Sequence, residues 1–397
     1  MLRTGRDGIH LDVALRHEPS GRVLWTDSRP FYPDALRELS GDLAEALLRT
    51  LGVTVSAAER SALAAGFPSS ADAFRDFLYA NRLLNLRTPA AVSLAAEHYR
   101  RATSRDSMYV AALARQAYAH PLLIDWGWRH PVLTHQELLR EGVTFADRAL
   151  RLDSTSAEAW LARPYLMVQQ HPRMMTGAVD AFKQAITLDP HNAEAFHQYG
   201  QTLMVLGRSQ EAMAAYRRSM ELEPDRAMTL VPMAAILRES GRVAEALRML
   251  VSAVSAAPEV AYARAVRSMV RSAVRDFHGA RDDAQASIRL DSTYQLPGLS
   301  ALARVSWLLI DTVRANESLE KARAAIVDQQ APSPTEASFF ASALVAMGRL
   351  DEAAEVVRRA RPRSAWLWFY FQRAEFEQLR KHPGVGAVLA EANPRAP

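Results

Sequence analysis

A period of 34 residues runs through the middle of the chain and constrains its fold more than any other feature. The positions that keep this step are Ala178, Ala212, Ala246 and Ala280, with Leu188 and Leu222, Pro190, Pro224 and Pro258, and Gly207 and Gly241. Columns that share one step indicate tandem copies of a single unit. A unit of this length is too short to bury its own apolar face, so it acquires a core only by stacking on its neighbours. The period therefore predicts a solenoid.

The composition is that of a folded protein without disulfides. The 397 residues are 49% hydrophobic and 23% charged, which is ordinary for globular proteins. The lack of cysteine excludes disulfides and thiolate metal sites but leaves the redox compartment open. Charged residues interrupt the first positions, and no run of about 18 apolar residues follows. We therefore expect a cytoplasmic protein without direct membrane insertion, and peripheral association with a membrane complex stays open.

The positive charge does not favour nucleic acid as a partner. The net charge is +4 and the pI is near 9.4. Lysine occurs only at Lys183, Lys321 and Lys381, so arginine supplies nearly all the positive charge. The arginines are scattered among Asp and Glu, without a block of like charges. Since neither a basic stripe nor a reading motif is present, nucleic-acid binding is disfavoured.

The first part of the chain is not repetitive. Apolar and polar residues alternate over residues 9–15, a turn falls at 18–21, and residues 22–26 form a returning strand, which together predict a β-hairpin. Leucines at helical spacing then predict a helix up to Leu51, and Ser56 to Glu59 have the form of a capping box that opens a short helix. The breakers at 66–70 predict the boundary, which gives an α/β module over 1–66 and a repeat domain over 67–392.

The repeat domain is expected to contain helix pairs only. The clearest copies run over 193–226 and 227–260, and a third begins at Ala157 with two extra residues around 169–175. Weaker second helices of such pairs fall near 95–102, 146–152, 280–290, 315–327 and 351–359. The sequence therefore predicts a mainly α-helical protein with about eight helix pairs, whose terminal copies are degenerate as capping repeats tend to be.

The clearest copy resembles a tetratricopeptide repeat. The matching residues are Phe196, Tyr199, Gly200, Leu203, Gly207, Ala212, Tyr216 and Pro224, and the resemblance is strong over 157–258. It implies a helix-turn-helix unit stacked into a superhelix. It also implies a scaffold or adaptor that binds proteins or peptides.

A second resemblance covers the hairpin and the tail. Residues 11–15 and 20–25 resemble the last hairpin of the TolB-N or FlgO-like domain of bacterial signalling proteins, and 42–47 resemble the helix that follows it. Residues 376–383 resemble the closing segment of those proteins. The resemblance implies a partial domain whose edge strand a partner strand covers by β-augmentation. The alternative is that the hairpin folds back on the helix from Pro33 to Leu51.

Signatures of catalysis are missing from the sequence. No GxSxG, Walker, Rossmann, kinase or HExxH motif occurs, and the spacing of His120, His130 and His135 matches no metal-ligand pattern. The pairs Asp282–Asp283 and Asp351–Glu352 fall where solvated helix faces are expected. We therefore expect no enzyme activity, no cofactor and no metal.

Two surfaces are candidates for partner binding. In solenoids of this class the first helix of each pair lines the concave groove, which predicts a set consisting of Glu158, Leu161, Tyr165, Glu194, His197, Gln201, Met204, Met228, Val231, Ala235 and Arg238. His197 and Gln201 depart from the Lys and Asn pattern that would clamp a chaperone tail. The second candidate is an aromatic insertion between the first two pairs, with Trp126, Trp128 and Arg129 as interface anchors.

The sequence leaves three functional hypotheses open. The leading one is a bacterial adaptor or assembly subunit without catalytic activity that docks partner proteins through the groove and the hairpin edge. The second is a detached sensory or regulatory module that acts with a separate DNA-binding or kinase chain. The third is an extrinsic subunit of a multi-subunit membrane complex, held there by protein contacts.

Overall fold

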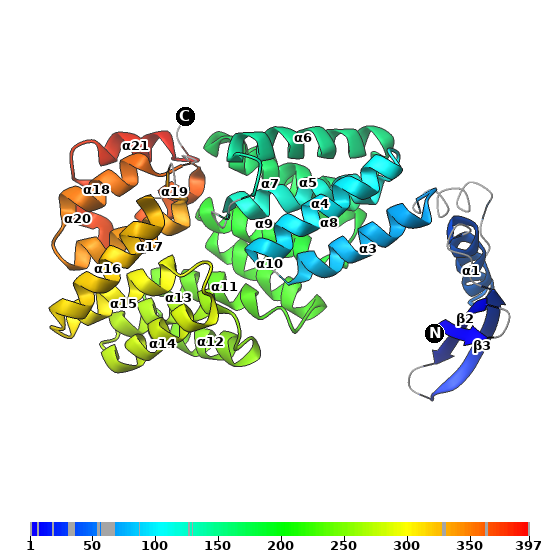
Figure 1. Ribbon diagram of the computed structural model, residues 1–397, viewed down its shortest axis with the longest axis horizontal. Coiled ribbons are helices and arrows are strands. Elements are labelled where there is room, and N and C mark those ends of the chain that lie inside the picture. Colours follow the sequence, from blue (N-terminus) through cyan, green and yellow to red (C-terminus); the bar gives the residue numbers. More distant parts are fainter. Residues whose placement is uncertain are drawn as a thin grey trace. The chain divides into compact units, whose positions relative to one another are not determined.

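The helices of the repeat region follow one another as pairs, as the period predicts (Figure 1). The computed structural model describes residues 2–5, 8–17, 20–30, 36–53, 56, 68–86, 88–125, 128, 130–327, 331–361 and 364–395. In the described part of the chain, α3 to α18 form eight such pairs, which confirms the predicted number. The first helix of each pair is called helix A and the second helix B.

The bounds of the pairs agree with the predicted repeats. The pairs are α3 (Ala71–Asn85) and α4 (Pro89–Arg105), α5 (Val110–Asp125) and α6 (His135–Leu152), α7 (Ala157–Gln170) and α8 (Met175–Leu188), α9 (Ala193–Val205) and α10 (Ser209–Leu222), α11 (Leu230–Glu239) and α12 (Val243–Ala256), α13 (Ala261–Ala273) and α14 (Phe277–Leu290), α15 (Leu296–Leu308) and α16 (Thr312–Val327), and α17 (Pro334–Ala346) and α18 (Leu350–Arg359). Ser70 caps α3 by accepting a hydrogen bond from the Ala73 amide. The short 3₁₀ helices η2 (Pro172–Met174) and η3 (Ala227–Thr229) precede α8 and α11, and η2 lies at the two extra residues of its repeat.

Small residues explain why the period is visible in the sequence. The four alanines that mark it are fully buried on successive B helices. In the clearest repeat Gly200 lies under the ring of Tyr216, and a Cβ added at Gly200 would stand 2.8 Å from that ring. Tyr216 is itself fully buried, so the small residue on helix A and the large residue on helix B fit as one contact.

The turn between helix A and helix B needs a left-handed residue. Five turns place such a residue two positions after helix A ends, with φ between 63° and 79°. Glycine fills it at Gly207, Gly241 and Gly348, whereas Arg275 and Ile310 adopt the same conformation with side chains. A left-handed φ is costly for any residue with a Cβ and most of all for a β-branched one. The repeat geometry therefore imposes strain on two of its own turns.

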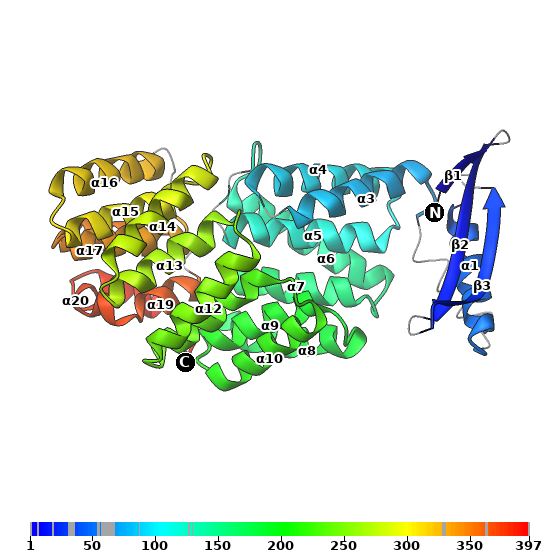
Figure 2. The same cartoon turned by 90° about the horizontal axis from the view of Figure 1, so that it is seen from below.

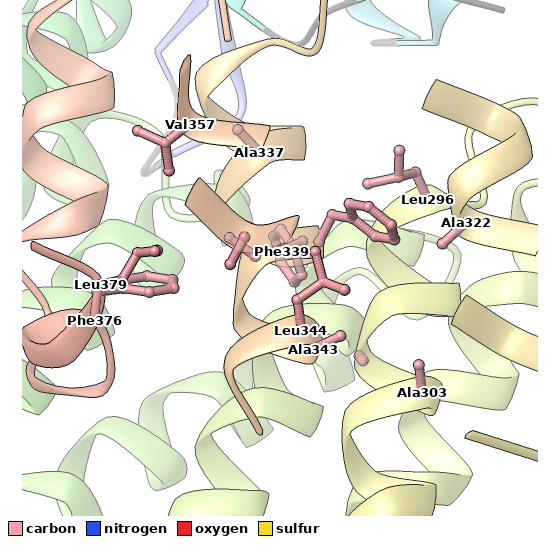
Figure 3. Packing of buried hydrophobic residues seen from close by; sticks show 14 of the residues in the cluster. Leu296, Ala303, Ala322, Ala337, Phe339, Ala343, Leu344, Val357, Phe376 and Leu379 are labelled. Atoms are coloured by element: carbon pink, nitrogen blue, oxygen red, sulfur yellow. The ribbon is translucent and has the colours of Figure 1, made fainter. Parts of the chain in front are cut away.

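The chain ends in shorter helices that pack on the last pairs. These are α19 (Ala365–Phe371), η4 (Ala374–Phe376), α20 (Glu377–Arg380) and α21 (Val385–Glu391). In Figure 3, Phe376 and Leu379 lie on one side of α17, and Leu296, Ala303 and Ala322 lie on the other. All five belong to one buried hydrophobic cluster, so α17 is covered on two sides by apolar side chains.

The amino-terminal residues form a small antiparallel sheet, which Figure 2 shows edge on with its helix. Its order is β1 (Leu2–Gly5), β2 (Gly8–His17) and β3 (Arg22–Pro30), and α1 (Leu36–Thr50) follows and contacts β3. The predicted hairpin is formed by β2 and β3. The additional strand β1 was not predicted, because four residues are too few to show a clear alternation. The predicted capping box extends from Ser56 into residues outside the described part of the chain.

The described chain groups into two compact units. One comprises residues 1–119 and 145–159, and the other comprises 120–144 and 160–397. The second unit holds the repeats of 193–260 and all that follow them. The division into 1–66 and 67–392 stays a prediction, because residues 57–67 lie outside the described part.

The strained turn at Ile310 yields a stability prediction. Its side chain is 85% exposed, so little packing is lost when it is removed. We expect Ile310→Gly to raise the free energy of unfolding by about 1 kcal/mol, because glycine adopts φ near +63° without a Cβ clash. Chemical denaturation measures the change. Ile310→Ala is the control, since it keeps a Cβ in the left-handed turn and should gain less; equal gains in both variants would contradict the strain argument.

Candidate functional site

Helix A of each pair lines the inner wall of the second unit. Successive A helices contact one another directly, α11 with α13, α13 with α15, and α15 with α17. A stack in which the same helix of every pair approaches its neighbours bends toward that helix. The A helices therefore form the concave side, which is the surface that solenoids use for extended ligands.

The apolar members of the predicted groove set contribute to the wall rather than to an open surface. Leu161, Tyr165, Met204 and Val231 are all buried. The hydroxyl of Tyr216 donates a long hydrogen bond to the Met204 sulfur at 4.0 Å, so this methionine is engaged with helix B of its own repeat. Met228 and Ala235 are partly buried. These side chains therefore contribute to the shape of the wall.

A polar network lies on α9 and its neighbour. The His197 ring contacts the Thr229 hydroxyl through Nδ1 at 3.0 Å and the Gln201 amide through Nε2 at 3.0 Å. Tyr216 packs beside the same ring, with centroids 5.6 Å apart. Gln201 Oε1 is buried and has no hydrogen-bond partner among the described residues. The network therefore holds His197 in one orientation and leaves an amide oxygen for a donor.

The two predicted glutamates are already paired. Glu194 accepts hydrogen bonds from Gln198 and from Arg226 of the next repeat. Glu158, in the first unit, accepts from Arg115 Nε at 2.9 Å and from Nη2 at 2.6 Å. These pairs link neighbouring repeats, which is a structural role.

The C-terminal segment extends onto the inner wall, which the sequence did not predict. Helix α19 contacts α9 as well as α17. The hydroxyl of Tyr370 accepts a hydrogen bond from Thr335 Oγ1 at 3.3 Å and is hydrogen-bonded to Tyr262. Arg395 lies over the Trp368 ring at 4.9 Å. The signal that could have shown this is the run of five aromatic residues within 365–371, more than a repeat helix needs.

Three arginines gather where this segment meets the A helices. Arg238 is on α11, Arg304 is on α15, and Arg373 precedes η4, which carries Glu375. Arg304 and Arg373 both lie within 4.0 Å of Glu375. Burial lowers the pKa of Arg238 to about 10, and the positive charges of Arg373 and Arg304 act in the same direction. Of this group the sequence predicted only Arg238.

The aromatic insertion is described only in part. Trp128 is buried, and its amide donates to the Leu123 carbonyl at 2.8 Å. Trp126 and Arg129 lie outside the described residues. The described tryptophan is therefore buried, and the insertion as an interface stays a prediction.

One expectation about the carboxylates is wrong. Asp282 is exposed as predicted, but Asp283 is only 3% exposed and accepts two hydrogen bonds from Arg267, at 2.7 and 2.5 Å. The reason is that Asp283 faces helix A of its own pair, where the larger arginine side chain spans the gap. Asp351, in contrast, is solvated.

A buried carboxyl group on α5 has an altered proton affinity. Asp125 accepts hydrogen bonds from the Tyr165 hydroxyl at 2.8 Å and from the Gln169 amide at 2.6 Å. Burial raises the pKa of Asp125 to about 6, and the two hydrogen bonds offset part of this effect. The group can titrate near neutral pH.

Metal-binding and membrane-spanning features were sought in the described ranges. His130 Nδ1 accepts from the amides of Val132 and Leu133, and burial lowers the pKa of His135. Within those ranges no group of three or more His, Asp or Glu side chains is placed to hold a metal ion. None of the described helices is long and apolar enough to cross a bilayer.

The buried ion pair gives a prediction for stability. Replacing Asp283 by Asn leaves the Arg267 guanidinium buried without its counter-charge, which typically costs about 3–5 kcal/mol. We expect Asp283→Asn to lower the free energy of unfolding by that order. Asp282→Asn is the matched control at the exposed neighbour and should change it by less than about 0.5 kcal/mol. Equal effects would show that Asp283 is solvated.

Asp125 gives a prediction for pH dependence. Its pKa of about 6 lies above the ordinary 3.8, so its contribution to stability is full below about pH 4 and is lost as the pH rises through 6. Between pH 5 and 8 the wild type should therefore lose about 1 kcal/mol more than Asp125→Asn. Denaturant titrations at the two pH values measure this difference, in which other titrating groups cancel. Parallel losses in both proteins would contradict the raised pKa.

Comparison with known proteins supports the repeat assignment. A family model described as tetratricopeptide repeat matches residues 174–229. No curated protein matches the chain. Among solved structures, yeast Tom70 aligns with 80% of this chain and 67% of its own, at 16% identity and a TM-score of 0.50. YrrB, described as a TPR protein with an unusual peptide-binding site, aligns with 52% of this chain and 98% of its own, at 21% identity and a TM-score of 0.33. PilF of Pseudomonas aeruginosa aligns with 53% and 93%, at 15% identity and a TM-score of 0.41.

The family match includes the clearest repeat, 193–226, and the fold of the described chain is a mainly helical solenoid. Residues 174–229 are therefore similar to tetratricopeptide repeats, and the described chain has the fold of a helical repeat solenoid.

Proposed function

We propose that this protein is a non-catalytic scaffold that binds a segment of a partner protein along the inner wall of its second unit. The observation that carries the proposal is the set of polar side chains on that wall. Gln201 offers an amide oxygen, and Arg238 and Arg304 offer guanidinium nitrogens, that have no hydrogen-bond partner in the described part of the chain. Buried polar groups of a folded protein are normally paired, so a partner segment that satisfies them gains affinity.

The arrangement also favours binding over catalysis. The inner wall presents hydrogen-bond donors and acceptors on several consecutive A helices rather than one converging constellation of acid, base and nucleophile. An extended peptide can lie along such a wall and contact several successive repeats. The predicted groove set enters this proposal with its polar members, His197, Gln201 and Arg238, as the contacting residues.

The experiment is site-specific photo-crosslinking in the native cells. A benzophenone amino acid at position 201 of the full chain should crosslink one partner protein. The same amino acid at position 217, which is exposed on helix B of the same repeat, should not yield that product. Equal products from both positions would contradict inner-wall binding, and so would the absence of a product from position 201.

A second contact surface is favoured by the sheet. Among the described residues β1 pairs with β2 from Gly8 to Leu11, and the same edge of β2 from Val13 to His17 has no strand partner there. A partner strand that pairs there would be β-augmentation. If the chain is a regulatory module, as the FlgO-like resemblance implies, this edge is where it would bind its signalling partner. Proline substitutions of Val13 and of Ala14, made in separate variants, test this edge with the same partner. The amides of neighbouring residues face opposite edges of a strand, so one of the two substitutions removes an amide from it.

A further inference from the structure

The three arginines on the inner wall are not matched by the carboxylate between them. Arg304 Nη1 lies 3.5 Å from Glu375 Oε2, and Arg373 Nη1 lies 4.0 Å from Oε1. Charge-assisted hydrogen bonds between arginine and carboxylate are usually about 2.7–2.9 Å long. The Arg267–Asp283 pair of the same unit shows that short two-point geometry, at 2.7 and 2.5 Å. The contacts to Glu375 are therefore loose.

Each arginine of the cluster keeps an unused donor. Arg238 Nη2, Arg304 Nε and Arg373 Nε are buried and lack a hydrogen-bond partner among the described residues. The remaining contacts of Arg304 are long ones to the Ser342 carbonyl at 3.3 Å and to its hydroxyl at 3.2 Å. The Arg373 guanidinium lies 5.0 Å from the centre of the Tyr370 ring. The three donors come from three parts of the chain: α11, α15 and the residue before η4.

The charges of the cluster do not cancel. Glu375 is the carboxylate that both Arg304 and Arg373 approach within 4.0 Å, so in the described part of the chain one negative charge meets two positive ones there. The mutual repulsion of Arg238, Arg373 and Arg304 contributes to the lowered pKa of Arg238. An added anion would relieve this repulsion in surroundings of low dielectric constant, where charges interact strongly.

The cluster remains reachable from solvent. The side chains of Arg304 and Arg373 are 15% and 16% exposed, and that of Glu375 is 21% exposed. The exposed parts lie on the inner wall, where the partner segment is placed by the proposed function. A guanidinium fork matches the two oxygens of a carboxylate, which a lysine ammonium does not.

We propose that Arg238, Arg304 and Arg373 form a binding site for the carboxylate of an acidic residue in the partner segment. The proposal rests on the proposed function and names the chemistry of the ligand. Because Arg373 belongs to the C-terminal segment and the other two belong to A helices, a bound carboxylate also ties that segment to the wall. The partner is thus expected to carry Asp or Glu at the position that meets α11 and α15.

The test uses a fluorescein-labelled hexaglutamate peptide and the full chain at low salt, with fluorescence anisotropy as the readout. The wild type should bind this peptide at least about tenfold more tightly than hexaglutamine. Arg238→Met should weaken binding at least about tenfold, while Arg217→Met, the same charge change at an exposed site, should alter it less than about twofold. Arg304→Lys keeps the charge but loses the fork, and should weaken binding by a smaller factor than Arg304→Met.

Stability separates a binding role from a structural one. Arg238→Met removes a buried charge without a close counter-ion, so its melting temperature should equal or exceed that of the wild type. A lower melting temperature together with unchanged affinity would overturn the proposal, and the Arg304 pair provides the affinity readout if Arg238→Met does not fold. Inorganic phosphate is the second probe: if it binds the wild type and hexaglutamate binds no tighter than hexaglutamine, the cluster holds small anions only and the proposal is overturned.

Failure of the carboxylate site can be distinguished from failure of the proposed function. A partner that crosslinks at position 201 but binds wild type and Arg238→Met equally would leave the scaffold role intact and overturn the carboxylate site. Loss of the position 201 crosslink would instead reject inner-wall binding as a whole.

Discussion

The structure depends on the close approach of helix A and helix B within each pair. Alanine at 178, 212, 246 and 280 allows that approach on successive B helices, and all four are fully buried. One pair has no other way to hide its apolar face than to stack on the next pair, so each contact supports the contacts beside it. The same close approach fixes the turn between the helices. The left-handed residue of that turn is therefore retained even where it is Arg275 or Ile310 and is strained.

The shorter helices that follow the eighth pair pack against the A helices. The short helix α19 contacts both α17 and α9, and Phe376 and Leu379 of the following elements join the buried cluster around α17. Apolar burial of this kind contributes roughly 25 cal/mol for each Å² removed from water. The segment therefore closes the apolar end of the stack, and in doing so it brings Tyr370, Arg373 and Glu375 onto the inner wall.

The pattern of the sequence was sufficient for the parts of the fold that local periodicity controls. The period placed α9 to α12, the breakers around Ser70 placed the start of α3, and the alternation over 9–15 placed β2. Contacts between residues distant in sequence leave no such pattern. Asp283 was predicted to be solvated because it falls on a helix B face that was expected to meet solvent, and only the fold shows that it faces Arg267. The same holds for Arg304 and Arg373, whose proximity arises from the inward turn of the C-terminal segment. Tyr165 and Met204 were placed on the correct helices, but their burial depends on neighbours that the period does not specify.

Two arginine clusters in the second unit differ in how well their charges are paired. Around Asp283, arginine and carboxylate form two short hydrogen bonds, which offset the free-energy cost of removing both charges from water. The pair therefore has a structural role. Around Glu375 the distances are longer, the donors outnumber the acceptors, and Arg238 has its proton affinity reduced. A smaller apolar side chain at position 238 would be more favourable for stability than a charge without a close partner. The proposed carboxylate ligand would supply the missing counter-charge from outside the chain, at the junction of α11, α15 and the C-terminal segment.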